Sequence, residues 1–381
     1  MIIAVNTRTL LADHLEGVGY FVQEVFRRIA AAHPEHRFYF LFDRPYDPRF
    51  VFGPNITPIV VSPPARHPIL WRLWFDLKVP LLLRRIKADV FVSPDGYASL
   101  TTKVPQCLVV HDLGFLHQPE AYKRIHLGYL RRRLPRFVRR ARQVATVSEF
   151  SRRDLQQQYG VPDEKLTVVY SAVKESFRPL PYEAQEAVKA QYTEGREYFI
   201  YAGALQPRKN IVNLLKAFSL FKKRQRSNWK LVLAGRMAWK NDELMKLLAT
   251  YKFRDDVVLT GYVDEAELVR LIGAAYALVY PSFFEGFGVP VLEAMKCGVP
   301  ALTSQHTSMS EIGGDAALYF DPKEPASIAE MMMYIYKDED GRARLVQEGF
   351  RQAEQFTWER TAEGVWSAIE KTIEQGTRNR E

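Results

Sequence analysis

The sequence predicts an α/β protein built from two Rossmann-like, doubly wound domains. Short apolar, β-branched runs alternate with segments of helical spacing along all 381 residues. This alternation is typical of parallel sheets joined by right-handed crossovers. The strand pattern stops in 171–196, where Pro179 and Pro181 precede a polar stretch. The length fits two domains, because 381 residues exceed the usual size of one.

Strand-like runs divide into two sets along the chain. The first set lies near 2–6, 37–42, 56–61, 89–93, 107–110, 143–147 and 167–170. The second set lies near 198–202, 230–234, 257–260, 277–281, 299–303 and 317–320. Helical spacing between them is clearest in 19–33, 210–225 and 264–276.

These sets define the expected domains. We expect an N-terminal domain over 1–175 and a C-terminal domain over 190–355, with 171–196 as the candidate linker. Ligands of doubly wound sheets bind beyond the carboxyl ends of the strands. Two such domains facing each other would form a cleft, which is a usual place for a small-molecule site.

Composition excludes several classes of protein. Apolar residues make up 47% and charged residues 25% of the chain, which is ordinary for a globular protein and excludes a mostly disordered one. No run reaches the ~18 apolar residues that cross a bilayer, and the start "MIIAVNTRTL" has no secretory signal. The only cysteines, Cys107 and Cys297, cannot form a disulfide framework or a metal site alone. A cytoplasmic location is the simplest interpretation.

The positive charge is concentrated in the first half. Residues 1–178 carry 27 Lys/Arg and 16 Asp/Glu, a net charge of +11. The rest of the chain carries −2, which gives +9 for the whole. Nine of the basic residues lie in 123–142, without an acid. Apolar residues recur there at helical spacing, which predicts a basic amphipathic helix that bends or breaks near Pro135. It can lie on an anionic membrane surface, or its apolar stripe can pack on its own domain and leave the arginines solvated.

A second candidate patch is aromatic. Trp71, Trp74 and Phe75 lie among basic residues in 67–85. Such aromatics suit a membrane interface or an apolar acceptor, and a core role is an equal alternative.

The largest group of candidate functional residues lies in 281–293, "PSFFEGFGVPVLE", directly after an apolar strand. Gly286 and Gly288 permit a tight turn, and Pro290 suits the first turn of a helix. A strand, a glycine turn and a helix N-terminus together favour a phosphate. Glu285 and Glu293 bracket this turn and would accept hydrogen bonds from sugar or ribose hydroxyls. Alternatively, Glu293 complements the helix dipole and Glu285 is a solvated loop residue.

A second anion signal is "GALQPRK" at 203–209, between a strand and a helix. In that position Arg208 and Lys209 can neutralise a leaving pyrophosphate. An Arg-Lys pair without such a context is usually an ordinary solvated pair on the surface.

The first half contributes weaker signals. Gly17 and Gly19 open a helix about ten residues after the first strand; the loop is too long for a dinucleotide fingerprint, so we interpret it as a flexible glycine loop over phosphate or sugar. His111 ends the strand "CLVVH", where it can contact a substrate hydroxyl or take part in proton movement. A lone histidine is more often structural.

Taken together, these motifs resemble one family, the retaining nucleotide-sugar-dependent glycosyltransferases of family 4 (glycosyl transferases group 1), which have the GT-B fold. The segment most similar to the family signature is "PSFFEGFGVPVLEAMKCGVPALTS" at 281–304. Further similar segments follow in order across nearly the whole chain: 109–122, 146–155, 201–210, 310–322 and 356–371. The resemblance implies that the domain over 1–175 binds the acceptor and the domain over 190–355 binds the nucleotide-sugar. It also implies that the last segment, within 356–381, is a helix crossing back onto the first domain.

The resemblance also implies residue roles. Glu285 would hold donor-sugar hydroxyls, Glu293 the ribose hydroxyls, and His111 the transferred sugar. Lys209 and Arg208 would bind the diphosphate. Many relatives have an arginine directly after the glycine that matches Gly203, but this chain has Ala204 there. Arg208 would then take the place of that arginine. The remaining donor contacts, mostly through the backbone, would come from Gly17, Gly19, Tyr262, Val263, Gly286, Phe287 and Gly288.

By resemblance, the reaction is transfer of a hexose, with mannose favoured, from a GDP- or UDP-sugar to a glycan or lipid-linked acceptor in cell-surface polysaccharide assembly. It would retain anomeric configuration and need no metal or other cofactor. The alternatives are an epimerase or phosphorylase of the same fold, or a non-catalytic protein that binds the nucleotide-sugar. We expect no nucleic-acid partner.

Overall fold

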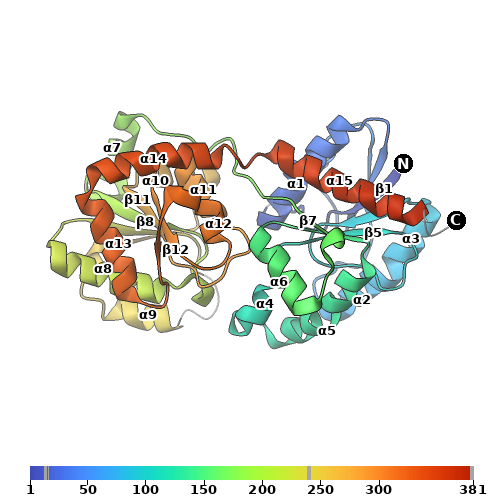
Figure 1. The fold of residues 1–381 in the computed structure, drawn as a ribbon, viewed down its shortest axis with the longest axis horizontal. Coiled ribbons are helices and arrows are strands. Elements are labelled where there is room, and N and C mark those ends of the chain that lie inside the picture. The colour runs from blue at the N-terminus through green and yellow to red at the C-terminus, as the bar shows by residue number, and fades with distance from the viewer. Residues whose placement is uncertain (13–14, 16, 238–241, 378–381) are drawn as a thin grey trace. The chain divides into compact units, whose positions relative to one another are not determined.

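The computed structural model describes residues 1–12, 15, 17–237 and 242–377 (Figure 1). The chain divides into two compact units, of which unit 1 comprises 1–171 with 357–381 and unit 2 comprises 172–356. Each unit is built around one parallel sheet with helical crossovers. The α/β, doubly wound fold expected from the alternating pattern is therefore present in both halves.

Unit 1 contains a sheet in the order β3-β2-β1-β4-β5-β6-β7. Its strands are β1 (Ile2–Asn6), β2 (Arg37–Phe42), β3 (Ile56–Val60), β4 (Val90–Ser93), β5 (Gln106–Val110), β6 (Gln143–Thr146) and β7 (Leu166–Val168). Its helices are α1 (Gly17–Ala32), α2 (Pro68–Leu73), the π-helical turn η2 (Trp74–Lys78), α3 (Val79–Arg85), α4 (Gly114–His117), α5 (Arg124–Arg140), α6 (Glu149–Tyr159) and α15 (Trp358–Thr377), with short 3₁₀ turns at Pro48–Phe50, Pro119–Ala121 and Asp163–Lys165. Figure 1 shows α1 and α15 on one side of this sheet and α4, α5 and α6 on the other.

Unit 2 contains a sheet in the order β10-β9-β8-β11-β12-β13. Its strands are β8 (Tyr198–Ala202), β9 (Lys230–Ala234), β10 (Val257–Gly261), β11 (Ala277–Tyr280), β12 (Ala301–Ser304) and β13 (Ala317–Phe320). Its helices are α7 (Tyr182–Thr193), α8 (Ile211–Gln225), α9 (Asp242–Ala249), α10 (Glu265–Gly273), α11 (Val289–Lys296), α12 (Met309–Gly313), α13 (Pro325–Lys337) and α14 (Glu339–Ala353), with 3₁₀ turns at Pro207–Lys209, Arg254–Asp256 and Gly314–Ala316. Strands β8, β9 and β11 are buried at every position, which explains why they appear in the sequence as continuous apolar runs.

The returning C-terminal helix is present. Helix α15 belongs to unit 1, where its Glu359 pairs with Arg28 of α1 at 2.8 Å. The hydroxyl of Thr361 donates to the carbonyl of Tyr170 at 2.6 Å, which fastens the start of α15 beside the end of β7. Residues 378–381, the end of the expected segment, lie outside the described residues.

Two local predictions need correction. The polar stretch 171–196 is not a plain linker, because it contains α7 and all of it after Ser171 lies within unit 2. The basic helix does not break at Pro135, since α5 continues through it to Arg140. Leu134, Phe137 and Val138 are buried on either side of Pro135, and this packing stabilises a helix that lacks one backbone hydrogen bond.

The two candidate membrane patches have different outcomes. Trp71, Trp74 and Phe75 are buried in the unit 1 core, and both indole nitrogens donate to backbone carbonyls, so the aromatic patch has the core role. The apolar stripe of α5 also packs on its own unit, but most of its arginines are exposed. Within the described residues, no helix is both long and apolar enough to span a bilayer.

Candidate active site

The order of strands in unit 2 locates a binding site. The chain moves outward from β8 through β9 to β10, and then returns to the other side of β8 to form β11, β12 and β13. The sheet therefore reverses direction between β8 and β11, and ligands of doubly wound folds bind beyond the carboxyl ends of the strands at such a point. The loops that follow these two strands are 203–210 and 281–288, the two segments in which the sequence predicted anion sites.

Three charged side chains meet where these two loops come together. The Lys209 ammonium lies 2.5 Å from Glu285 Oε1, and the Arg208 guanidinium lies 3.1 Å from Glu285 Oε2. Arg208 also donates to the carbonyl of Phe284 at 2.5 Å. Lys209 and Glu285 are each only 8% exposed. The basic pair and the acid, which were predicted from separate motifs, thus form one cluster in which Lys209 and Glu285 are buried and Arg208 is half-buried.

The electrostatics of this cluster keep Glu285 ionised. Burial alone would raise the pKa of the Glu285 carboxyl, but the charges of Lys209 and Arg208, with hydrogen bonds from Lys209 and Ser282, outweigh it and lower the pKa to about 2. An anionic carboxylate can only accept hydrogen bonds, so it suits sugar hydroxyls as donors. The two cations beside it suit a phosphate, which accepts.

Three hydroxyl-bearing residues complete the cluster and were not predicted. Tyr280, the last residue of β11, receives a hydrogen bond from Lys209 at 2.5 Å and donates to Glu285 at 3.2 Å. The Ser282 hydroxyl donates to Glu285 Oε1. The Ser308 hydroxyl lies 3.0 Å from the carbonyl oxygen of Glu285 and 2.8 Å from that of Phe287, which supports the turn from behind. Their position in the sequence could have indicated them, because Tyr280 and Ser282 are polar residues at the carboxyl end of a buried strand.

The backbone of the two loops is specified by two residues in the left-handed region. Gly288 has φ of 108° and immediately precedes α11, a conformation that favours glycine. Asn210 has φ of 61°, and its amide donates to the carbonyls of Pro281 at 3.0 Å and Pro322 at 2.6 Å. Asn210 therefore ties the loop after β8 to the loops after β11 and β13. Gly286 and Phe287 are buried within the turn.

Glu293 lies on α11 and has a different environment from Glu285. Burial raises the pKa of its carboxyl to about 7, and the charge of Glu265 adds to this while Lys174 opposes it. Glu265 itself is occupied, because its carboxylate lies 2.5 Å from Lys174 and 2.6 Å from the Ser176 hydroxyl. An ionised Glu293 is thus poorly compensated by nearby charges.

Tyr262 and Val263 follow β10 at the same carboxyl edge of the sheet. Tyr262 is 72% exposed and Val263 is partly buried. Their loop is two strands away from β8 in the sheet order, so their side chains are not part of the cluster around Glu285.

In unit 1, His111 directly follows β5. Its Nε2 lies 2.9 Å from the carbonyl oxygen of Pro94, and because a carbonyl only accepts, Nε2 carries the proton and Nδ1 is the acceptor. Burial lowers the pKa of the imidazole, so the neutral form predominates at neutral pH. The ring meets Phe21 of α1 edge to face at 5.0 Å.

The sheet of unit 1 has its own reversal point, between β1 and β4. Arg8 follows β1 and Asp95 follows β4, and their side chains pair at 2.5 Å. The guanidinium also lies 4.4 Å from the centre of the Tyr97 ring. Sequence reasoning missed this pair because the two residues are 87 positions apart and no motif joins them.

Gly17 and Gly19 lie in the first turn of α1, so they do not form the flexible loop that was expected. A Cβ on Gly19 would lie 2.5 Å from the carbonyl oxygen of Thr9. Glycine is needed at this position because the helix approaches the backbone after β1. Positions 13, 14 and 16, just before the helix, lie outside the described residues.

Comparison with known proteins shows the family of this chain. The model of the family "Glycosyltransferase Family 4" matches residues 15–177, and that of "Glycosyl transferases group 1" matches residues 184–352. The chain is 31% identical over 299 residues to O-antigen chain mannosyltransferase B of Escherichia coli, covering 77% of this chain and 78% of the relative. It is 31% identical over 278 residues to an O-antigen chain mannosyltransferase of Salmonella typhimurium, covering 72% of each.

Solved structures show the same fold. Sucrose-phosphate synthase from Thermosynechococcus elongatus superimposes with a TM-score of 0.79 at 18% identity, covering 98% of this chain and 99% of that one. An Anabaena protein, HepE, in complex with UDP-glucose superimposes with a TM-score of 0.76 at 16% identity, covering 97% and 99%. The fold is GT-B, and the chain belongs to the family 4 glycosyltransferases, the glycosyl transferases group 1.

Proposed function

We propose that this glycosyltransferase moves a mannosyl residue, with retention of anomeric configuration, from a nucleotide-diphospho-sugar to a glycan or lipid-linked acceptor in cell-surface polysaccharide assembly. GDP-mannose is the favoured donor. The observation that carries the proposal is the buried cluster of Arg208, Lys209 and Glu285 at the reversal point of the unit 2 sheet. The choice of mannose rests on the relatives, which are O-antigen mannosyltransferases.

Donor binding would exchange the partners of this cluster. In the ligand-free protein the two cations and Glu285 satisfy one another. A bound donor brings a diphosphate, which accepts from Arg208 and Lys209, and sugar hydroxyls, which donate to Glu285. Glu293 would accept hydrogen bonds from the ribose, Tyr262 and Val263 would flank the base, and backbone amides from Gly286 to Gly288 would face the phosphates.

During transfer the bond between the anomeric carbon and the diphosphate oxygen breaks, and a bond to the acceptor oxygen forms. Negative charge grows on the diphosphate as it leaves, where Lys209 and Arg208 stabilise it. The acceptor proton passes to that leaving group on the same face of the sugar, which accounts for retention. His111, neutral and fixed by Pro94, would contact the transferred sugar.

The direct test is a donor screen with the purified full-length protein. We expect one of GDP, UDP and ADP to raise the melting temperature by mass action, with GDP favoured. The matching mannose donor should then yield an α-linked product on an oligosaccharide or lipid-linked acceptor, as identified by NMR of the anomeric proton. Lys209→Ala should abolish both effects, whereas Lys216→Ala, which removes an exposed lysine from α8, should leave them intact. The proposal is refuted if the protein epimerises the donor, as an epimerase would, or releases a sugar phosphate, as a phosphorylase would. It is also refuted if the protein binds the nucleotide but transfers no sugar.

We further propose that unit 1 associates with the cytoplasmic face of a membrane containing anionic lipids. Arg72, Arg124, Arg132, Arg133 and Arg136 line a groove of about 570 Å³ between α2 and α5. Ile69 and Ile125, which are 71% and 52% exposed, lie in the same groove. Clustered arginines beside exposed aliphatic residues match the charge and the apolar boundary of such a surface. Cys107 and Cys297 are free thiols, which is compatible with a reducing compartment.

A further inference from the structure

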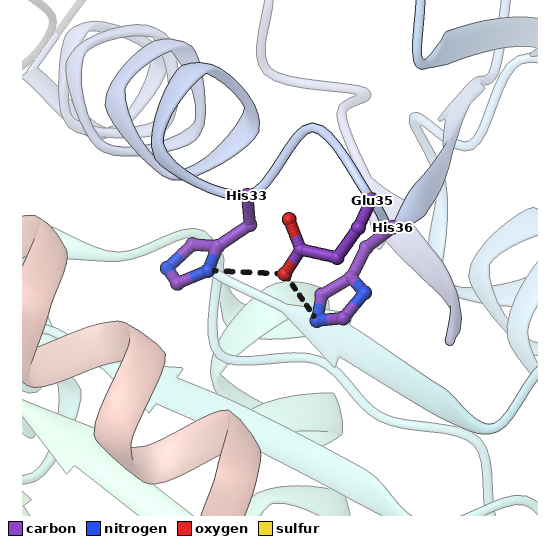
Figure 2. A group of neighbouring side chains, drawn as sticks. All are labelled: His33, Glu35 and His36. Carbon is purple, nitrogen blue, oxygen red and sulfur yellow. Dashed lines mark ion pairs between the residues drawn. The ribbon is translucent and has the colours of Figure 1, made fainter.

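The short turn between α1 and β2 gathers three metal-binding side chains on the described surface of unit 1. His33, Glu35 and His36 each present one ligand atom, and these atoms all lie within 4.8 Å of one another (Figure 2). Glu35 Oε1 lies between the two rings, 3.7 Å from His33 Nδ1 and 3.2 Å from His36 Nε2. Tetrahedral zinc with bonds of ~2.0–2.1 Å separates its ligand atoms by about 3.4 Å. The two distances bracket that value.

The turn is rigid, so the ligands are held in place before any ion arrives. The amide of His36 donates to the carbonyl of His33 at 3.2 Å, and Pro34 occupies the second position of this turn, which its fixed φ favours. The Asn55 amide donates to the carbonyls of Ala30 at 2.9 Å and His33 at 3.3 Å. The end of α1 and the start of the turn are therefore fastened to the chain before β3.

The imidazole rings are also fixed, by Trp366 of α15. Its ring centre lies 3.7 Å from that of His33 and 5.4 Å from that of His36. The two imidazole centres are 5.9 Å apart with planes 5° apart, which is less than the ~7 Å that opposite faces of one indole would impose. Both rings thus lie side by side on one face of Trp366, and an ion between them can lie near both ring planes.

The site is open to solvent. Glu35 is 60% exposed, and His33 and Trp366 line a groove of about 650 Å³.

We propose that His33, Glu35 and His36 form a site for a divalent transition-metal ion, with Zn²⁺ as the natural occupant and water completing the coordination. Two imidazoles and one carboxylate suit zinc, whereas magnesium prefers oxygen ligands alone. The turn precedes β2 and so lies at the amino edge of the sheet, opposite the carboxyl edge that carries Arg8, Asp95 and His111. The ion would therefore stabilise the junction of α1, β2 and α15 and take no part in glycosyl transfer.

Calorimetric titration of the EDTA-treated full-length protein tests this. We expect a single Zn²⁺ ion to bind at micromolar concentration and Mg²⁺ not to bind. Loss of a supporting residue around a metal costs ~10–100-fold in affinity, so Glu35→Gln and His36→Gln, which each remove a ligand, should weaken Zn²⁺ binding by at least about tenfold. His306→Gln, which removes an exposed histidine in unit 2, is the matched control and should have no effect.

Trp366 supplies an independent readout. Cu²⁺ bound beside its indole should quench part of the tryptophan fluorescence, and Trp366→Phe should remove that quenched part while keeping Zn²⁺ affinity. The proposal is overturned if Glu35→Gln and His36→Gln bind Zn²⁺ like the unmodified protein, if Mg²⁺ binds equally well, or if no Zn²⁺ binds. Glu35→Gln alters an exposed side chain, so the test does not depend on a variant that disturbs the core.

Discussion

The ammonium of Lys209 lies 2.5 Å from the carboxylate of Glu285, and both side chains are buried at the reversal point of the unit 2 sheet. Neither charge has bulk water to solvate it, so each depends on the other until a ligand arrives. The same contact therefore stabilises unit 2 and, under the proposed function, would exchange partners when the donor binds.

The first prediction concerns this dual role. Glu285→Gln should lower kcat/KM for transfer by about 10²-fold or more, since it removes the charge that pairs with the two cations and that we propose accepts from the donor sugar. It should also lower the free energy of unfolding by roughly 3 kcal/mol, because Lys209 stays buried and Arg208 half-buried without their counter-charge. Steady-state kinetics and urea unfolding at pH 7 measure the two effects.

The stability loss should have a definite pH dependence. The pKa of Glu285 is about 2 in the folded protein and 4.5 for an ordinary glutamate. Its stabilising effect is therefore complete above pH 4.5 and is lost as the pH falls towards 2. The unfolding curves of Glu285→Gln and the unmodified protein should converge over that range. A constant difference would show that the carboxylate charge is not what stabilises the site.

Glu293 should behave in the opposite way. Its pKa of about 7 means that the folded protein holds a proton which the unfolded chain releases near pH 4.5, so its contribution to stability falls as the pH rises from 4.5 to 7. Glu293→Gln should thus unfold at higher urea than the unmodified protein at pH 8, with no difference at pH 4. It should also weaken nucleotide binding by about tenfold, since an ionised acceptor for ribose hydroxyls is lost. Unchanged nucleotide affinity would remove Glu293 from the donor site.

Most of the fold could be predicted from the sequence, because strands buried on both faces, such as 198–202, stand out as apolar runs between helical segments. Helix α7 was missed because 182–193 is polar and only weakly amphipathic, and its stability depends on Val188 packing against unit 2. The sequence predicted the basic helix but left open whether it bends or breaks near Pro135, and α5 continues there because tertiary packing outweighs local propensity.

The charged members of the unit 2 cluster could also be predicted, because glycines, a proline and acids at fixed spacing mark the turn. Their pairing could not. A sequence shows that Lys209 and Glu285 are 76 positions apart, but only the strand order β8-β11 brings their loops together. The Arg8–Asp95 pair in unit 1 was invisible for the same reason.

His111 supports a separate prediction about transfer. Its neutral ring is held through Nε2 by Pro94, so it can position a sugar hydroxyl without holding a charge. His111→Ala should lower kcat by about 10²-fold, within the usual range for a positioned polar group, while calorimetry shows nucleotide affinity almost unchanged. Equal losses in binding and turnover would assign it to nucleotide binding instead.

The Arg8–Asp95 pair should prove strongly coupled. Arg8→Met leaves Asp95 buried without its partner and should lower the free energy of unfolding by about 3 kcal/mol. The double variant Arg8→Met, Asp95→Leu should recover most of that loss, because two apolar residues replace two charges. Urea unfolding of the four proteins in a double-mutant cycle measures the coupling. Additive losses would mean that the two side chains stabilise the unit independently.

The basic groove leads to the last prediction. Arg124, Arg132 and Arg136 are exposed on α5, whereas Arg133 is committed to an ion pair with Asp76 and should be left intact. Replacing the three exposed arginines with serine should weaken co-sedimentation with vesicles of anionic lipid by more than tenfold at low salt, since each basic residue near such a surface contributes ~1 kcal/mol. Binding to neutral vesicles should be weak in every case.

A matched control separates this local effect from net charge. Lys337, Arg344 and Arg351 are exposed residues of unit 2, and replacing them with serine removes the same charge from another surface. That triple variant should sediment like the unmodified protein, and both variants should transfer sugar to a water-soluble acceptor at the normal rate. Equal weakening by the two triple variants would mean that vesicle binding follows total charge, and the groove between α2 and α5 would then have no specific role at the membrane.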